Sequence, residues 1–268
     1  MIPPVRALAM RELVRFFRQP HRVVGSFAQP LLFWIFLGSG FSPAFRMAGA
    51  GMERVSYLEY FYPGILLMTM LFAGIFSTIT IIEDRNAGLL QEVLVSPASR
   101  LSVVLGKTLG AMAIALLQSL VLLAAAPFIG LTPGPGSLLM ILGGFVLASL
   151  GFTALGFLIA WPMESTAGFH AVMSVFLMPL WMLSGALFPL EGAPGWLWGL
   201  MTVNPVSHAL QLIRLPFYHS PAELLTHSGY LTGLAVSTAW AVGCLALALW
   251  RVGQVERGAD PASAVGTP

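Results

Sequence analysis

Residues 83–107 read EDRNAGLLQEVLVSPASRLSVVLGK and form one of only two strongly polar segments in the chain. They separate two apolar stretches, each long enough to cross a bilayer as a helix. A short charged segment that also carries exposed leucines needs a surface to cover them. The segment therefore predicts a membrane-spanning fold and a place at which a partner in the surrounding water binds.

The composition indicates that most of the chain lies in lipid. Its 268 residues are 57% hydrophobic and only 9% charged, with a mean hydropathy of +0.84. Soluble domains carry about 25% charged residues. The net charge of +2 gives no support to nucleic-acid binding. The single cysteine, Cys244, allows neither an intrachain disulfide nor a thiolate metal cluster, so no metal is expected.

Six apolar stretches are long enough to cross the membrane. They cover residues 23–41, 62–82, 105–129, 137–161, 171–188 and 230–250. The predicted fold is an all-α polytopic membrane protein with a six-helix transmembrane domain at 23–250. A cytoplasmic amphipathic interfacial helix at 1–22 precedes this domain. A small, polar tail at 251–268 follows it, and we expect the tail to be disordered.

Lysines and arginines are distributed unevenly between the two sets of connections. One set contains the N-terminus, residues 83–104, residues 162–170 and the C-terminus. Together with the start of the third span it holds ten basic residues: Arg6, Arg11, Arg15, Arg18, Arg22, Arg85, Arg100, Lys107, Arg251 and Arg257. The opposite set holds only three: Arg46, Arg54 and Arg214. Cytoplasmic loops carry the basic excess, so both termini are predicted to be cytoplasmic, which requires an even number of spans.

Two topologies other than six retained spans are possible from the sequence. Ala48-Gly49-Ala50 resembles a signal cleavage site, but the preceding apolar run of 19 residues exceeds the roughly 7–15 of a secretory signal. Residues 188–203 could form a seventh span, but their continuous apolar part is under about ten residues, which is typical of a re-entrant or interfacial segment. A retained first span and six spans in total are therefore predicted.

Residues 5–19 have the pattern of an amphipathic helix. Arg11, Arg15, Arg18 and Arg22 recur at helical spacing on one face. Such a helix lies in the plane of the interface with its arginines toward anionic headgroups. Two roles stay open: a membrane-surface anchor, and a brace that also contacts a cytoplasmic partner.

The central polar segment predicts a helix of two to three turns. Glu83 and Asp84 stand where this helix would begin, where acids favour the positive end of its dipole. Pro97 ends it. Its apolar stripe consists of Leu89, Leu90, Val93 and Leu94. A solvated turn is the simpler interpretation, but the unburied leucines favour contact with a partner.

Two blocks of the sequence follow a recognisable pattern. The first consists of Glu83, Gly88, Leu89, Leu90, Leu94, Ser96, Pro97, Arg100, Gly106 and Lys107. The second consists of Leu183, Ser184, Gly185, Pro189, Pro194, Asn204, Pro205 and Arg214. Together they resemble the signature of the ABC-2 type permeases, the membrane subunits of bacterial ABC exporters. The resemblance covers nearly the whole chain, including its six spans.

The resemblance implies a transport subunit rather than an enzyme. Such a permease moves an amphiphilic drug, a lipid or a lipid-linked glycan across the cell inner membrane. ATP and magnesium would be bound by two copies of a separate ABC ATPase subunit, so no cofactor is expected in this chain. The other expected partners are membrane lipid and a second permease subunit in a homodimer; nucleic acid is not a partner.

The resemblance also implies which residues carry the function. The loop at 83–97 would be a coupling helix that docks in a groove of the ATPase. Its candidate residues are Glu83, Asp84, Arg85, Gly88, Leu89, Leu90, Glu92, Val93, Pro97 and Arg100. The interfacial helix, with Arg11, Arg15 and Arg18, would pack near that subunit. Residues 189–215 would form re-entrant external helices, and the gate residues would be Ser184, Gly185, Pro189, Pro194, Asn204 and Pro205.

Gly106-Lys107-Thr108 invites a phosphate-loop interpretation. That motif needs a further glycine five residues before Gly106, and the chain has Leu101 there. We instead expect Lys107 to extend from the start of the third span to the cytoplasmic headgroups. Gly106 and Gly110 form a G-x-x-x-G pair that could let two helices pack closely.

Two functions of other classes remain as alternatives. An intramembrane serine protease would use Ser184 with a base such as His208, which needs the two side chains within hydrogen-bond reach. An ATP-independent carrier would want acids or histidines at mid-membrane depth, and the predicted spans contain none.

Overall fold

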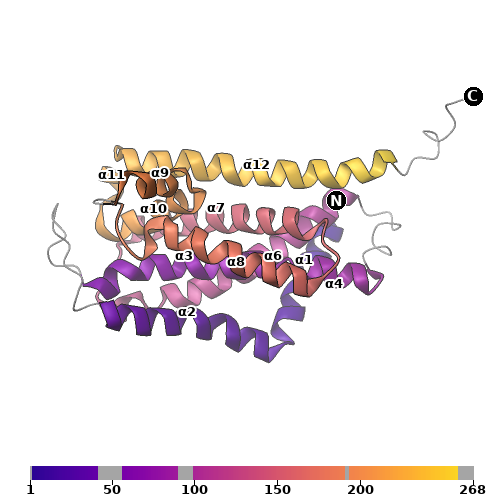
Figure 1. Ribbon diagram of the computed structural model, residues 1–268, viewed down its shortest axis with the longest axis horizontal. Coiled ribbons are helices and arrows are strands. Elements are labelled where there is room, and N and C mark those ends of the chain that lie inside the picture. The colour runs from indigo at the N-terminus through magenta and orange to yellow at the C-terminus, as the bar shows by residue number, and fades with distance from the viewer. Residues whose placement is uncertain (1, 42–55, 90–98, 191–192, 259–268) are drawn as a thin grey trace, which may run out of the picture.

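The computed structural model describes residues 2–41, 56–89, 99–190 and 193–258, and Figure 1 shows these as helices joined by short connections. No strand occurs within those four ranges. Six segments are long and apolar enough to cross a membrane, which confirms the predicted six-span, all-α fold.

The spans differ slightly from the predicted ranges. Two of them continue, past a break, into a shorter helical segment. The six are α2 (Pro20–Phe41), α3 (Tyr57–Ser77) with α4 (Thr80–Asn86), α6 (Arg100–Leu123), α7 (Pro135–Ala160), α8 (Thr166–Trp181) with the π-helical η2 (Met182–Ala186), and α12 (Ser228–Gly258). The shorter helices are α1 (Ile2–Phe17), η1 (Ala126–Ile129), α9 (Gly195–Val203), α10 (Pro205–Tyr218) and α11 (Pro221–Leu224).

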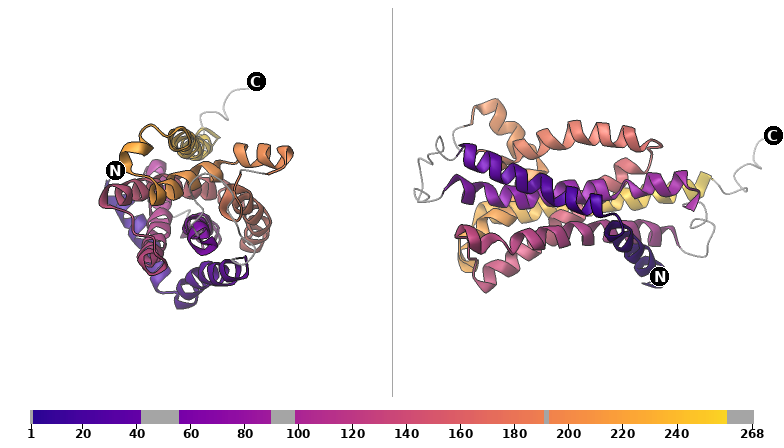
Figure 2. Two further views of the ribbon diagram at one scale, coloured as in Figure 1. Left: turned by 90° about the vertical axis from the view of Figure 1, so that its left-hand side faces the viewer. Right: turned by 90° about the horizontal axis from the view of Figure 1, so that it is seen from below.

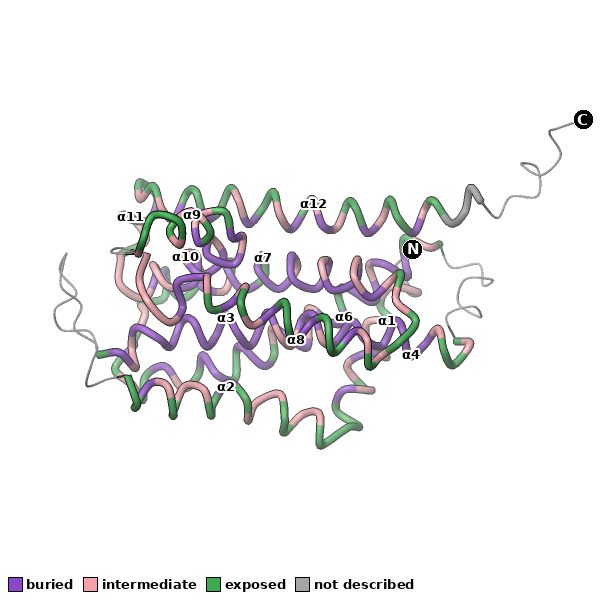
Figure 3. Tube along the Cα trace, viewed as in Figure 1, coloured by how far each residue is buried: buried purple, intermediate pink, exposed green. Residues whose placement is uncertain are grey.

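The central helix of the bundle is α3. It packs against α2, α6, α7, α8 and α10, and Figure 2 shows it surrounded when the bundle is viewed end on. Its most apolar window is 83% buried, whereas that of α2 is only 11% buried. Figure 3 shows the same contrast between the purple core and the green outer faces of α2 and α12. A helix that is apolar on all sides belongs in the core.

The short elements divide between the two ends of the bundle (Figure 1). One end holds α1, α4 and the C-terminal part of α12, and we call it the α1 end. The other holds α9, α10 and α11, and we call it the α9 end. The two described ends of the chain therefore lie on the same side of the bundle, as an even number of spans requires.

Residues 195–203 do not form a seventh span. They form α9, whose nine residues extend about 14 Å at 1.5 Å per residue, less than half of a bilayer core. The next helix, α10, packs deep in the α9 end against α3, α7 and α12. A Cβ atom at Gly144 of α7 would lie 3.2 Å from Leu212, so this glycine allows the close approach of α10.

Candidate functional site

Six charged side chains meet at the α1 end, and we call them the charge cluster. They are Arg11, Glu12 and Arg15 of α1, Glu83 and Asp84 of α4, and Lys107 of α6. Arg11 donates two hydrogen bonds to the two carboxylate oxygens of Asp84, both at 2.9 Å. Arg15 donates to Asp84 at 3.0 Å and to Glu83 at 2.6 Å. Lys107 donates to both Glu12 and Asp84.

The centre of the charge cluster is buried. Glu12, Asp84 and Lys107 are only 3%, 2% and 4% exposed. Three positive and three negative side chains balance one another, as buried charges require. The hydrogen bonds from Arg11 to Asp84 raise the pKa of the Arg11 guanidinium, so the pair stays ionised. The cluster thus joins α1, α4 and α6 at one point.

The charge cluster corrects two expectations. Arg11 and Arg15 do not face lipid headgroups, because both donate to the carboxylates of α4. Lys107 does not reach the headgroups either, because it lies buried between Glu12 and Asp84. Arg18, just beyond α1, lies on the exposed surface.

The two glycines beside Lys107 bring α1 against α6. A Cβ atom at Gly106 would lie 2.7 Å from the Cβ of Leu8 and 3.2 Å from the carbonyl oxygen of Val5. A Cβ atom at Gly110 would lie 2.8 Å from the Cβ of Glu12. The G-x-x-x-G pair therefore packs two helices closely, as its spacing indicated.

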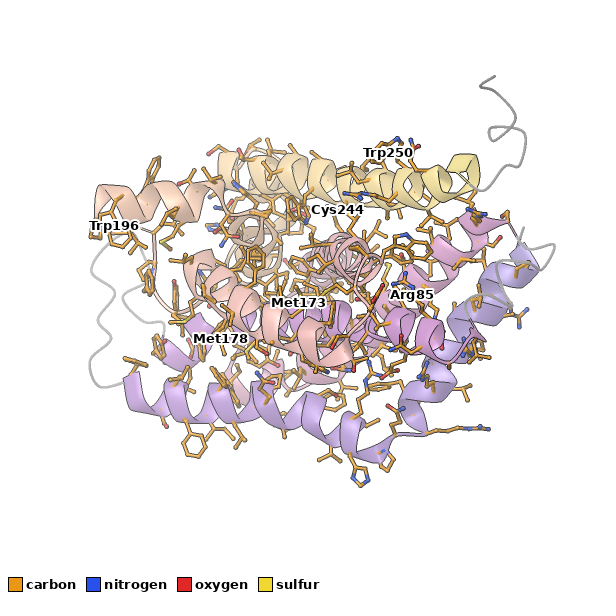
Figure 4. All side chains as sticks on the ribbon, turned by 45° about the vertical axis from the view of Figure 1, so that its right-hand side comes forward. Arg85, Met173, Met178, Trp196, Cys244 and Trp250 are labelled. Atoms are coloured by element: carbon orange, nitrogen blue, oxygen red, sulfur yellow. The ribbon has the colours of Figure 1, made fainter. Side chains whose placement is uncertain are left out.

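Residues at the end of α4 bind the connection between α7 and α8. Arg85 donates to the carbonyl oxygen of Met163 at 2.8 Å and to that of Trp161, and its guanidinium lies 5.4 Å from the centre of a Trp161 ring. Asn86 donates to the carbonyl oxygen of Glu164 at 3.1 Å. Figure 4 labels Arg85 within this end of the bundle. Contacts on two sides thus hold α4, with α1 and α6 on one and the α7–α8 connection on the other.

The predicted coupling helix is described only at its two ends. Gly88 has a positive φ of 76°, which ends α4, and Leu89 next to it is exposed. Leu90, Glu92, Val93 and Pro97 lie outside the described residues. The chain is described again at Ser99, whose side chain caps α6 just before Arg100.

The candidate gate residues lie together at the α9 end. Ser184 and Gly185 belong to η2, and Gly185 has a positive φ of 84°. The hydroxyls of Tyr60 and Tyr57, both on α3, donate to the carbonyl oxygens of Gly185 at 2.8 Å and of Leu187 at 3.1 Å. These bonds attach the irregular end of the fifth span to the central helix.

The remaining gate residues organise the turns around α9 and α10. Pro189 lies in the connection after η2, and Pro194 precedes the first turn of α9. Asn204 accepts a hydrogen bond from the Val206 amide at 3.0 Å, which caps α10, and donates to the Leu180 carbonyl at 2.7 Å. Pro205 occupies the first position of α10, where a missing N–H costs nothing.

Ser184 does not form a nucleophile–base pair with His208. The Ser184 hydroxyl is buried and donates to the Trp181 carbonyl at 2.6 Å. The Nε2 atom of His208 bonds instead with the Thr202 carbonyl at 2.9 Å. Both side chains therefore serve the local backbone, and the geometry gives no support to a serine protease.

Glu12 also belongs to this site, although it is not among the residues that the sequence patterns indicated. Glu12 is an acid on the side of α1 that packs against α6, and its partner stands between two small residues of a G-x-x-x-G pair. A charge at such a closely packed position is a sign of a buried ion pair, and that signal was available.

Comparison with known proteins agrees with this geometry. Residues 4–218, from α1 to the end of α10, match the ABC-2 type transporter family. The chain is 31% identical over 216 residues to the ycf38 protein of Cyanophora paradoxa, which is named as a transport permease; the match covers 80% of this chain and 73% of that one.

Two bacterial relatives are named as ABC transporter permeases. YbhR of Escherichia coli K12, named for multidrug transport, is 28% identical over 199 residues, which cover 74% of this chain and 54% of YbhR. DrrB1 of Streptomyces coeruleorubidus, named for daunorubicin resistance, is 26% identical over 229 residues, which cover 79% of this chain and 76% of DrrB1. The chain therefore belongs to the ABC-2 type transporter family, as a multi-pass membrane permease.

Proposed function

We propose that this chain is the membrane subunit of an ATP-driven exporter that moves an amphiphilic drug, lipid or lipid-linked glycan. Permeases of this family work with an ABC ATPase and often dimerise. In the proposed complex two copies of the chain form a homodimer, and each copy docks one ATPase, which binds ATP and magnesium. The complex lies in the cell inner membrane with both termini of the permease in the cytoplasm.

The observation that carries this proposal is the charge cluster. It joins α4, which contains Glu83 and Asp84 at the start of the proposed coupling segment 83–97, to α1 and to α6, which begins at Arg100. Separating buried ionic partners leaves uncompensated charges, at a cost of about 3–5 kcal/mol per broken pair. The three helices therefore move together, and a displacement of the coupling helix is transmitted to the spans on both sides of it.

The proposed direction of force starts at the α1 end and finishes at the α9 end. The segment α3–α4 runs the length of the bundle, from the charge cluster to the tyrosines that hold η2. Ser184, Gly185 and the turns around Pro189, Pro194, Asn204 and Pro205 would form the external gate. A shift of α3 would alter the two tyrosine hydrogen bonds, and with them the shape of η2.

The docking surface can be tested by co-purification of the permease with the proposed ABC ATPase subunit. Changing Leu89 and Leu90 to Asp places charges where an apolar contact is proposed, so recovery of the ATPase should fall at least about tenfold and ATP-driven transport should be lost. Leu225→Asp is the matched control, because Leu225 is exposed at the α9 end. Full ATPase recovery with the double variant would contradict the proposed docking site.

A further inference from the structure

A cavity of about 540 Å³ lies between α2, α3 and α8 near the α1 end. Its volume is in the range of sites that hold small molecules, about 300–1,000 Å³. Both α2 and α8 pack on α3, and the cavity occupies the space between them. Both polar and apolar side chains line the cavity, and their chemistry indicates the kind of molecule that it can bind.

Polar side chains line the cavity along one face of α2. Gln19, Arg22, Ser26 and Gln29 line it from α2 and its preceding turn, at a spacing of three, four and three residues, so they share one helical face. His170 and Ser174 line it from the start of α8. Polar groups on a span are costly in lipid unless they face a cavity or another protein group.

Arg22 brings a positive charge to this cavity, on which the charges of Glu83 and Glu12 act from a distance. Its guanidinium donates to the Phe76 carbonyl oxygen at 3.2 Å, and it forms no ion pair among the described residues. The acid that shares the cavity, Glu83, is already bound by Arg15 at 2.6 Å. Arginine presents parallel N–H groups that fit the oxygen atoms of a phosphate or carboxylate.

One buried polar atom that faces the cavity has no hydrogen-bond partner among the described residues. Gln118 of α6 lines the cavity and is only 1% exposed, and its Oε1 atom has no hydrogen-bond partner in the described structure. A buried acceptor left unpaired costs about 1–3 kcal/mol. A hydroxyl or N–H group on a bound molecule would satisfy it.

Apolar side chains line the cavity on its α3 and α8 sides. They include Met68 and Phe72 of α3 and Met178 of α8; Figure 4 labels Met178 on α8. Farther along α2 and α8, the rings of Phe33 and Trp181 meet edge to face, with centroids 6.0 Å apart. From Arg22 to Pro30 the lining face of α2 extends about 12 Å at 1.5 Å per residue.

We propose that this cavity binds an amphiphile with an acidic head group, a phosphate or a carboxylate. Arg22 holds the anionic oxygen atoms, Gln118 accepts a hydrogen bond from a donor on the same molecule, and the apolar chain lies along Met68, Phe72 and Met178. That the bound amphiphile is the transported molecule rests on the proposed function. Its binding in the cavity requires the permease alone.

Photolabelling of the purified permease in nanodiscs of neutral lipid tests the inference. Two probes carry the same diazirine in a dodecyl chain, one with a phosphate head and one with a trimethylammonium head. The phosphate probe should label the cavity faces of α3 and α8 at least about tenfold more than the cationic probe, because only its charge complements Arg22. Unlabelled dodecyl phosphate should compete, and inorganic phosphate should not.

Matched variants identify the group responsible. Arg22→Gln should lower labelling by the phosphate probe about tenfold, Arg22→Lys should retain part of it, and Arg251→Gln, an exposed arginine on α12, should leave it unchanged. Equal labelling by both probes would overturn the inference. So would labelling outside the cavity, competition by inorganic phosphate alone, or an equal effect of Arg22→Gln and Arg251→Gln.

The outcome is separable from that of the proposed function, because no ATP or ATPase is present. Selective labelling by a permease that never associates with an ATPase would leave the binding site standing and remove the transport role. Normal ATPase association together with equal labelling by both probes would leave the transport role standing and remove the binding site.

Discussion

Lys107 shows how a single residue organises the α1 end. Its ammonium group lies between the carboxylates of Glu12 and Asp84, which come from two different helices. Asp84 also accepts hydrogen bonds from Arg11 and Arg15, whereas Lys107 is the only ion-pair partner of Glu12 among the described residues. Loss of the Lys107 charge therefore leaves a buried carboxylate unpaired.

Lys107→Met should lower the stability of the purified permease by about 3–5 kcal/mol, measured as thermal unfolding in detergent. The double variant Lys107→Met, Glu12→Leu should recover part of the loss, because it removes the unpaired charge. Arg18→Met is the control, since Arg18 is exposed. Equal stability of Lys107→Met and Arg18→Met would show that the cluster does not hold the helices together.

Some contacts of the charge cluster are not predictable from the sequence. The sequence places Glu83 and Asp84 at the start of the predicted coupling helix, whereas both lie within α4. Their partners Arg11 and Arg15 were assigned to lipid, since a helical pattern shows which residues share a face but not what that face contacts. The approach of α1 to α6 brings Lys107 to Glu12 across 95 positions of sequence, which no local pattern encodes.

At the scale of elements, the packing of α1 on α6 depends on small side chains. A Cβ atom at Gly106 would meet the Leu8 side chain and the Val5 carbonyl, so α1 has no room to accept it without moving. The same contact positions Glu12 over Lys107. Packing of these two helices and formation of the ion pair are therefore coupled.

Gly106→Ala should destabilise the permease by about 1–3 kcal/mol through overpacking. It should also speed proteolytic cleavage in the turn between α1 and α2, because α1 is held less tightly. Gly143→Ala on α7 is the matched control: no atom lies within 4 Å of its added Cβ, so alanine there should be neutral or slightly stabilising. Indistinguishable cleavage rates for the two variants would contradict this view of α1.

The spans were predictable as elements, whereas their irregular ends were not. Runs of about 20 apolar residues define all six spans by length. The π-helical turn of η2 depends on tertiary contacts instead, because Tyr60 of α3 donates to the Gly185 carbonyl oxygen within it and Tyr57 donates to that of Leu187 just beyond it. The cavity was not predictable either, because one of its walls comes from α8, which is far from α2 and α3 in the sequence.

For the molecule as a whole, the described chain begins and ends on one side of the bundle (Figure 1). The basic residues predict that this side is cytoplasmic. Reporter fusions at the N-terminus and C-terminus should therefore both be active in the cytoplasm, and a fusion in the α6–α7 connection at residues 132–134 should be active outside. An external reporter at either terminus would reverse the proposed orientation and move the coupling segment away from any ATPase.

The central position of α3 is a property of the whole bundle. Its sequence is strongly apolar, but so is that of α7, and composition alone does not rank them. The structure places α3 in contact with five other helices, so that its two ends connect the charge cluster and η2. This connection makes the transfer of motion from one end to the other physically reasonable.

Site-specific cross-linking between Leu89 and the ATPase tests the central proposal most directly. Leu89→Cys would be made in a Cys244→Ser background, which removes the only native thiol. A short bifunctional reagent should then join position 89 to the ATPase subunit, with a yield that changes when ATP binds. Labelling of this thiol by an impermeant reagent added outside intact cells, without any cross-link to a nucleotide-hydrolysing chain, would contradict the account.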